Sequence, residues 1–190
     1  MSQAWRTKKP DADEHAPFYK GYIDEAPASD LVDTMEEQNR SLPAMLLEVP
    51  EARGGFRYAE GKWTLREVVQ HLNDAERVFS FRLLWFARNS GTDLPGFDEN
   101  RWVPAGDAEQ RTLADLAAEF SAIRKSTIAM IKLMTDDAMR RRGTANGKQI
   151  SCQALAWVMA GHVAHHARVL RERYLVPPVQ AKSPAAATPG

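Results

Sequence analysis

The stretch ALAWVMAGHVAHHARVLRERYL covers residues 154–175 and carries three of the five histidines of this 190-residue chain. Its apolar side chains recur at steps of three and four residues, which is the spacing of one face of an α-helix. Ser151 is suited to cap this helix, whose range we predict as 152–174. The stretch therefore predicts a long amphipathic helix with one face in a protein core.

Two histidines of this helix continue its apolar face. His162 and His166 are four residues apart, so their side chains lie one above the other on the same side of the helix. Two imidazoles in this arrangement can reach one metal ion without distorting the helix. His165 lies about 60° around the helix from His162, on the side away from His166, and we expect it to be a neighbour of the site.

A second helix supplies another inward histidine. The stretch KWTLREVVQHLNDAERVF, residues 62–79, opens a helix predicted over 65–89, with Thr64 and Glu67 in a capping box. His71 lies on its apolar face. Three imidazoles with an open coordination position describe a catalytic zinc site, and nickel, iron and manganese are alternatives because imidazole suits several metals. Histidines at helical spacing also occur by chance, so the pattern alone leaves ordinary packing open.

Two further helices complete the predicted fold. They cover residues 30–49, where Pro43 is expected to kink the helix or break it near Ser41, and residues 113–134. Four amphipathic helices of about 20 residues predict an all-α four-helix bundle without strands. The connection over 90–111, between the second and third helices, is long for a bundle, and long ordered loops are often functional.

The ends of the chain differ in composition from its helical part. Residues 1–28 are polar and contain proline, so we expect an irregular N-terminal arm, in which the segment PFYKGYI can dock through its rings. Residues 29–175 form the predicted metal-binding bundle domain. Residues 176–190 are rich in proline and alanine and poor in large apolar side chains, which predicts a disordered tail.

The composition indicates a cytoplasmic globular protein. The 25 basic and 25 acidic side chains balance to a formal net charge of zero, which argues against a nucleic-acid partner. We interpret the basic run at 140–142 as a helix end. The sequence predicts no signal peptide and no membrane span. The single cysteine, Cys152, is typical of a reducing compartment, and its place just after a helix cap is one that can lower a thiol pKa.

Three stretches resemble the DinB-like superfamily and, within it, the YfiT-like metal-dependent enzymes. They are KWTLREVVQHLNDAERVF, PGFDENRW (residues 95–102) and ALAWVMAGHVAHHARVLRERYL. The most specific elements are W-[ST]-x-x-[EQ]-x-x-x-H starting at Trp63 and G-H-x-x-H-H starting at Gly161. The resemblance implies an up-down-down-up four-helix bundle with long crossovers. It also implies that one divalent metal ion is bound by His71, His162 and His166.

The resemblance further implies a metal-dependent enzyme that acts on a small molecule. Two reactions fit: transfer of a low-molecular-weight thiol to an electrophile, as in a thiol S-transferase, or hydrolysis by an activated water. The resemblance supports both reactions, and pairing of two chains as a homodimer is compatible with it. The alternative is a non-catalytic metal-binding bundle of a stress response. A DNA-binding protein is disfavoured by the neutral net charge.

Five polar residues are candidates for further roles at this site. Glu67 and Asp74 lie within about one turn of the histidine on the second helix, so either could act as a base or orient a ligand, although Glu67 also serves the cap. His165 is a candidate for a supporting role beside the ligands. Asp98 and Asn100, in the long connection, could meet a substrate. A solvated helix position suits Asp74 equally well, and a surface loop suits Asp98 and Asn100 equally well.

Overall fold

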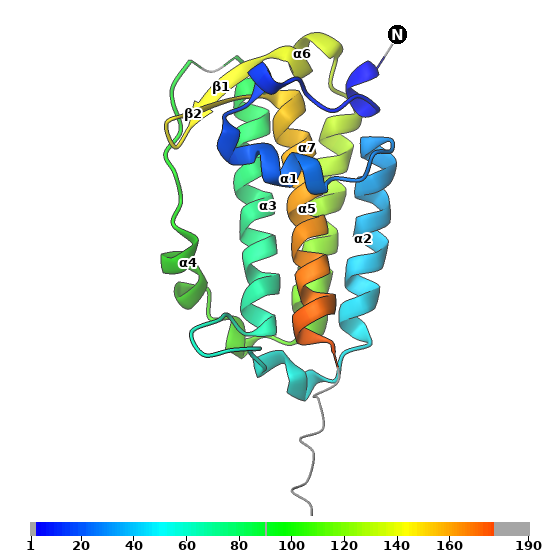
Figure 1. Ribbon diagram of the computed structural model, residues 1–190, viewed down its shortest axis with the longest axis vertical. Coiled ribbons are helices and arrows are strands. Elements are labelled where there is room, and N and C mark those ends of the chain that lie inside the picture. The colour runs from blue at the N-terminus through cyan, green and yellow to red at the C-terminus, as the bar shows by residue number, and fades with distance from the viewer. Residues whose placement is uncertain (1–2, 90, 177–190) are drawn as a thin grey trace, which may run out of the picture.

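The computed structural model describes residues 3–89 and 91–176. Four long helices form a bundle (Figure 1). They are α2 (Leu31–Leu47), α3 (Leu65–Ala87), α5 (Leu113–Lys132) and α7 (Cys152–Val169). A π-helical turn, η6 (Leu170–Tyr174), continues α7. The tail predicted to be disordered lies, from residue 177 onward, outside the described residues.

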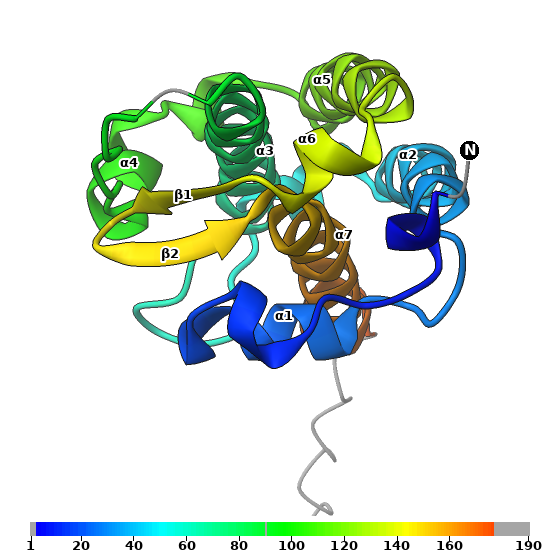
Figure 2. The ribbon, with the colours of Figure 1, turned by 90° about the horizontal axis from the view of Figure 1, so that it is seen from above.

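The topology is the predicted up-down-down-up arrangement. Helices α3 and α5 run parallel to each other and antiparallel to α2 and α7 (Figure 1). Seen along the bundle, α2 and α3 lie at opposite corners, and each packs on both α5 and α7 (Figure 2). Helix α3 therefore lies beside α7, so the histidines predicted on these two helices can face each other.

Local sequence explains where two of the helices begin. The Oγ1 of Thr64 accepts a hydrogen bond from the Glu67 amide at 3.2 Å, and the Glu67 carboxylate accepts one from the Thr64 amide at 2.6 Å. Thr112 and Asp115 form the same reciprocal pair at the start of α5. Each pair satisfies amides that have no partner inside the helix, and the predicted starts of both helices are confirmed.

Helix α2 is one continuous element through Pro43. The break considered near Ser41 does not occur, although proline removes one amide donor from the helix. Leu42 and Leu46, on either side of Pro43, are both buried in the core. Their burial stabilises the helical conformation by more than one missing hydrogen bond costs.

The connection from α3 to α5 carries the chain back along the bundle. It contains α4 (Glu99–Ala105) and a short turn, η5 (Ala108–Gln110), and follows the outer side of α3 (Figure 1). Because α3 and α5 run parallel, the chain must travel back along α3 before α5 can begin. Helix α4 packs on α3, which brings the predicted functional loop against the helix that carries His71.

A small β-hairpin precedes α7, and the prediction of a fold without strands is wrong at this point. Strands β1 (Arg142–Ala145) and β2 (Lys148–Ser151) pair antiparallel and lie across one end of the bundle (Figure 2). The turn residues Asn146 and Gly147 have φ values of 54° and 67°. Two successive left-handed residues form the tight turn that matches the twist of a hairpin.

The basic run at 140–142 belongs only in part to a helix end. Arg140 is the last residue of α6 (Asp136–Arg140), as expected, but Arg142 is the first residue of β1. The Arg142 side chain forms an ion pair with Asp13 at 2.9 Å. This basic side chain therefore fastens the hairpin to the N-terminal segment instead of facing a helix dipole.

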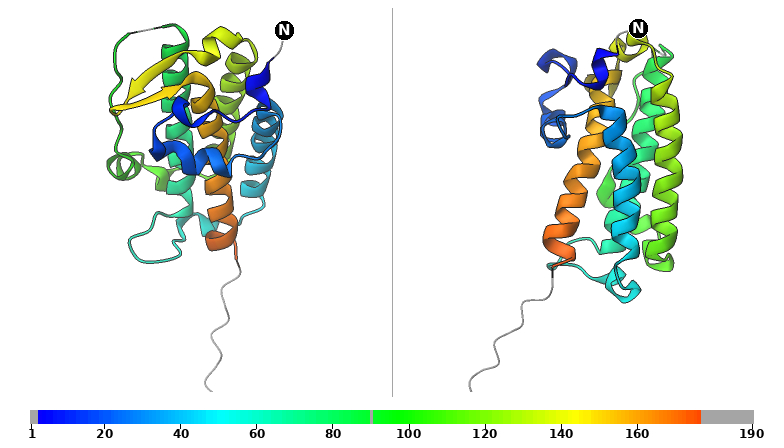
Figure 3. Two further views of the ribbon diagram at one scale, coloured as in Figure 1. Left: turned by 45° about the horizontal axis from the view of Figure 1, so that its top comes forward. Right: turned by 90° about the vertical axis from the view of Figure 1, so that its right-hand side faces the viewer.

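The N-terminal segment is more ordered than an irregular arm. It forms three short turns, η1 (Ala4–Arg6), η2 (Ala12–Glu14) and η3 (Pro17–Tyr19), followed by α1 (Lys20–Glu25). Helix α1 lies outside the ring of four helices, against α7 (Figure 3). The docking expected of PFYKGYI occurs: a Cβ added to Gly161 of α7 would lie 1.7 Å from the carbonyl oxygen of Tyr22. Glycine is needed at this close contact.

The bundle core contains a buried ion pair between two of its helices. Glu76 of α3 and Arg124 of α5 are 3% and 0% exposed, and their charged groups lie 3.1 Å apart. Burial raises the pKa of Glu76, and the charge of Arg124 opposes this effect.

Every helix in the described part of the chain is too short or too polar to traverse a lipid bilayer.

Candidate metal centre

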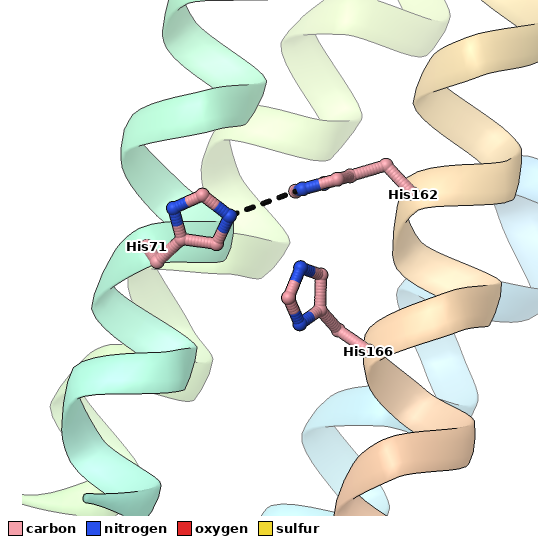
Figure 4. A group of neighbouring side chains, drawn as sticks. All are labelled: His71, His162 and His166. Atoms are coloured by element: carbon pink, nitrogen blue, oxygen red, sulfur yellow. Dashed lines mark hydrogen bonds between the residues drawn. The ribbon is translucent and has the colours of Figure 1, made fainter. Parts of the chain in front are cut away.

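Three histidines converge between α3 and α7. The side chains of His71, His162 and His166 point toward one another across the gap between the two helices (Figure 4). One ring nitrogen from each lies within 4.8 Å of the other two, and Nε2 of His71 is 3.1 Å from Nε2 of His162. The ring centroids are 4.6–5.1 Å apart. The structure thus brings together the three residues that the sequence analysis selected as ligands.

Burial keeps these imidazoles neutral. His71 and His162 are 7% and 5% exposed, and His166 is half-buried. Burial lowers the pKa of His71 to about 4 and that of His166 to about 3. The pKa of His162 is also well below its ordinary value, first because of burial and then because of the neighbouring imidazoles. Neutral imidazole is the form that binds a metal ion.

The three nitrogens suit a divalent transition metal. Two nitrogens bound to one tetrahedral zinc ion lie about 3.3 Å apart, because each Zn–N bond is about 2.0 Å long. The separation of 3.1 Å between His71 and His162 is close to this value. A ligand set of three histidines leaves one coordination position for water or substrate, as in catalytic zinc sites. The chemistry of the donor set therefore suggests a divalent metal.

A cleft of about 190 Å³ opens beside the three histidines. Its walls are largely aromatic: Tyr22 and Phe79 have ring centroids 5.2 and 5.6 Å from that of His162, and Trp63 lies 5.0 Å from His71. Residues of α1, α3 and α7 line the cleft. The aromatic rings exclude water from the histidines on these sides, and the cleft leaves access for a small molecule.

Three polar side chains also line the cleft. They are Arg82 of α3, Glu99 of α4 and Asn146 of the hairpin turn. Glu99 is exposed, whereas Arg82 is 5% exposed. The cleft thus presents a carboxylate at a solvent-exposed position and a buried cation, in addition to the imidazoles.

The predicted supporting residues have partners outside the three histidines, although the ring centroid of His165 lies 5.1 Å from that of His166. Glu67 is held in the capping box of α3. Asp74 accepts a hydrogen bond from Gln70 at 3.0 Å and lines a neighbouring hollow instead of the cleft; burial raises its pKa. His165 places its Nδ1 2.8 Å from a carboxylate oxygen of Glu25. Each of these three side chains therefore has a polar partner other than the three histidines.

The long connection contributes residues adjacent to those that the sequence analysis selected. Asp98 caps α4 by accepting a hydrogen bond from the amide of Asn100 at 3.0 Å, and both residues are exposed. Of the described residues in this connection, Phe97 and Glu99 line the cleft. Because α4 is helical, neighbouring residues point in different directions. Locating the connection in the sequence therefore does not tell which of its residues face the cleft.

Several cleft residues were not selected from the sequence. In the sequence, Trp63 is only the first residue of a motif, and Tyr22 is only part of a docking segment. The sequence alone suggests that Arg82, like three other helical arginines, is solvated, although one of the four could hold an acidic substrate or thiol; the structure buries Arg82. Its spacing of eleven residues from His71, three helical turns, places both on one face of α3. No local signal connects Asn146 with this site, because tertiary packing alone brings the hairpin there.

Comparisons with known proteins agree with this architecture. The profile of the DinB superfamily matches residues 34–170. A protein of Geobacillus kaustophilus, named as a candidate metal-dependent hydrolase, is 26% identical over 111 residues, which are 57% of this chain and 62% of that protein. The match thus spans less than two thirds of the relative's own length.

Two solved structures share the fold. YfiT from Bacillus subtilis, described as a probable metal-dependent hydrolase with an unusual four-helix bundle topology, has a TM-score of 0.63 and 20% identity over 74% of this chain and 84% of its own. The mycothiol-dependent maleylpyruvate isomerase has a TM-score of 0.61 and 15% identity over 76% of this chain and 61% of its own. At these identities, the likeness concerns the fold alone.

Proposed function

This chain belongs to the DinB superfamily, and from this premise we propose that it is a metal-dependent enzyme that acts on a small molecule. The convergence of His71, His162 and His166 beside an accessible cleft carries the proposal. Zinc is the first choice for the metal, and nickel, iron and manganese are the alternatives. The relatives named as metal-dependent hydrolases support a metal-dependent function.

The cleft supports catalysis over a non-catalytic metal-binding bundle. A purely structural site is usually closed by four protein ligands, whereas three histidines lie here beside a cleft. A divalent ion held there would act as a Lewis acid and would acidify a water or thiol that reaches it. The neutral imidazoles would hold the ion, and Tyr22, Phe79 and Trp63 would keep bulk water from it.

Metal analysis of matched histidine variants tests this proposal. The wild-type chain should bind about one divalent ion, and His71→Ala, His162→Ala and His166→Ala should each lower the affinity by at least about a hundredfold. His165→Ala is the control, because it removes an imidazole of the same helix whose Nδ1 lies 2.8 Å from Glu25 and whose nitrogens are not among the converging ligand atoms. Equal metal content in the wild-type and His162→Ala chains would reject the site.

Transfer of a thiol is the reaction that we place first. Two carboxylates were expected to act as bases. Glu67 is engaged in the helix cap, and Asp74 bonds to Gln70 and lies outside the cleft. A thiol has an ordinary pKa of about 8.5 and needs less help from a base than water does. The fold shared with a mycothiol-dependent isomerase is compatible with a low-molecular-weight thiol as cosubstrate.

Hydrolysis is the second candidate, and Glu99 is the observation that favours it. Its carboxylate lines the cleft and acts on the pKa of His71 by its charge. A base at this position could accept a proton from water. Glu99→Gln should lower a hydrolytic rate by about a hundredfold or more and change thiol conjugation less than about threefold.

Rates measured with and without cellular thiols distinguish the two reactions. An electrophile consumed only when a thiol is present identifies a transferase, and an ester or amide cleaved in its absence identifies a hydrolase. Glu109→Gln, which changes an exposed carboxylate of η5, serves as the control for the loss of one surface charge. Pairing into a homodimer and a cytoplasmic location stay predictions, and light scattering tests the first.

A further inference from the structure

Arg82 is a buried cation in the wall of the cleft. Its side chain is 5% exposed, and its Nη2 donates a hydrogen bond to the carbonyl oxygen of Pro95 at 2.9 Å. Within the described residues, no carboxylate forms an ion pair with it, and the titratable group that acts on its pKa besides burial is the phenol of Tyr19, whose own pKa is raised by burial. Arg124, the other deeply buried arginine of the bundle, has Glu76 as its partner. Arg82 thus differs from Arg124 in lacking a counter-ion.

This lack of a counter-ion has an energetic consequence. Burial lowers the pKa of Arg82, and a cation in a protein interior is stable only when its charge and its donors are matched. A guanidinium carries five N–H donors, and one carbonyl oxygen accepts from this one. The remaining donors suit an anion that enters the cleft, which the guanidinium can bind through two parallel hydrogen bonds.

The position of Arg82 on α3 relates it to the three histidines. It follows His71 by eleven residues, so the two lie within about 20° of one another around the helix, and their Cα atoms are about 16 Å apart along it. Side chains of a helix lean toward its N-terminus, which directs Arg82 toward His71. A ligand bound to Arg82 can therefore extend along the cleft toward the histidines.

We infer that Arg82 determines specificity by binding a carboxylate group of the small molecule, while the reacting end of that molecule lies at the three histidines. This inference rests on the proposed function. A single guanidinium balances the one negative charge of a carboxylate, whereas a phosphate carries up to two. Glu99, which lines the same cleft, disfavours the additional charge. The ligand class is therefore a small monocarboxylate.

A structural role for Arg82 makes different predictions. The side chain links α3 to Pro95 of the connection and lies 5.8 Å from the ring of Phe97. It also lines a second, mostly apolar hollow of about 390 Å³, beside Val78. If Arg82 only fastened the connection, its replacement would lower stability without changing the preference of the protein for a charged ligand.

Calorimetric titration with two matched thiols tests the inference. The metal-loaded wild-type chain should bind mercaptohexanoate about tenfold more tightly than the neutral mercaptohexanamide. Arg82→Gln keeps a donor for Pro95 but should abolish the preference, and Arg82→Lys should retain part of it. Arg77→Gln is the control, because Arg77 lies on the same helix and pairs with Glu119 at 2.6 Å. Its preference should equal that of the wild type.

Two further variants identify what recognises the carboxylate. In His162→Ala the preference for the carboxylate should persist, because Arg82 is intact. Loss of the preference in this variant would assign recognition to the metal and overturn the inference. Val78→Phe narrows the second hollow, and loss of the preference in this variant would place the anion outside the cleft. Equal wild-type affinities for the two thiols, or an unchanged preference in Arg82→Gln, would also overturn it.

The outcomes separate this inference from the proposed function. A wild-type chain without metal would reject the proposed function. Its preference for mercaptohexanoate over mercaptohexanamide would still report on Arg82. A chain that binds metal through the three histidines but shows no preference would leave the metal site standing and reject the role of Arg82. Circular dichroism of each variant verifies that it folds.

Discussion

The thiol of Cys152 lies in the first turn of α7, where the positive end of a helix dipole favours a thiolate. The side chain is 0% exposed, and its Sγ lies 3.9 Å from the carbonyl oxygen of Leu83. Burial raises the pKa of this thiol to about 12 and outweighs the opposing charge of Arg141. The lowered pKa considered from the position after the cap is therefore wrong, because burial was not visible in the sequence.

This residue should resist alkylation in the folded protein. With a pKa of about 12, the thiolate is scarce at neutral pH, so the native chain should react with iodoacetamide at least about a hundredfold more slowly than the chain unfolded in urea. The rate should rise with pH up to the pKa if the fold persists. Mass spectrometry of timed samples measures it, and rapid native labelling would contradict the described burial.

At the scale of elements, two glycines differ in backbone conformation although both have free space around them. Gly147 has φ of 67° in the hairpin turn, and Gly21 lies in α1 without a positive φ. A Cβ added to either would meet no atom within 4 Å. The two positions therefore differ in backbone conformation and not in available space.

Opposite effects on stability should follow from the two alanine substitutions. Gly147→Ala should lower the free energy of unfolding by about 1 kcal/mol, because an L-residue is strained at positive φ. Gly21→Ala should raise it by about 0.5 kcal/mol, because alanine favours a helix. Urea denaturation followed by circular dichroism measures both. Equal effects of the two substitutions would contradict the turn conformation.

At the scale of the whole molecule, the N-terminal segment completes a site whose ligands come from the bundle. Helix α1 packs against α7 at Gly161, and its Tyr22 covers His162. Trp157 of α7 donates a hydrogen bond from Nε1 to the carbonyl oxygen of Trp5 at 3.0 Å. The wall of the cleft therefore depends on docking of a segment that precedes all four bundle helices.

A methyl group at residue 161 should displace that segment. The Cβ of Gly161→Ala would overlap backbone atoms of Tyr22, so the free energy of unfolding should fall by about 1–3 kcal/mol. Limited proteolysis should then cut the chain before α2 more rapidly. Gly55→Ala, whose Cβ meets nothing within 4 Å, is the control. A wild-type digestion pattern for Gly161→Ala would show that α1 does not dock as described.

The sequence by itself determined the four bundle helices and the three histidines that converge. Helical periodicity is a local property, so His162 and His166 at a spacing of four, and His71 on an apolar face, could be placed without knowing the neighbours of each helix. The capping pair of Thr64 and Glu67 is equally local. The resemblance to a known superfamily added the topology that sets α3 beside α7.

Only the tertiary structure decided which other side chains surround the histidines. Tyr22, Glu99 and Asn146 come from three segments far apart in the chain, and their meeting depends on how α1, α4 and the hairpin pack on the bundle. The hairpin itself has strands of four residues, too short for a clear alternation, although Asn146 and Gly147 are a local turn signal. Burial raises the pKa of Cys152 and removes Arg82 from solvent, and it arises from packing of the whole chain.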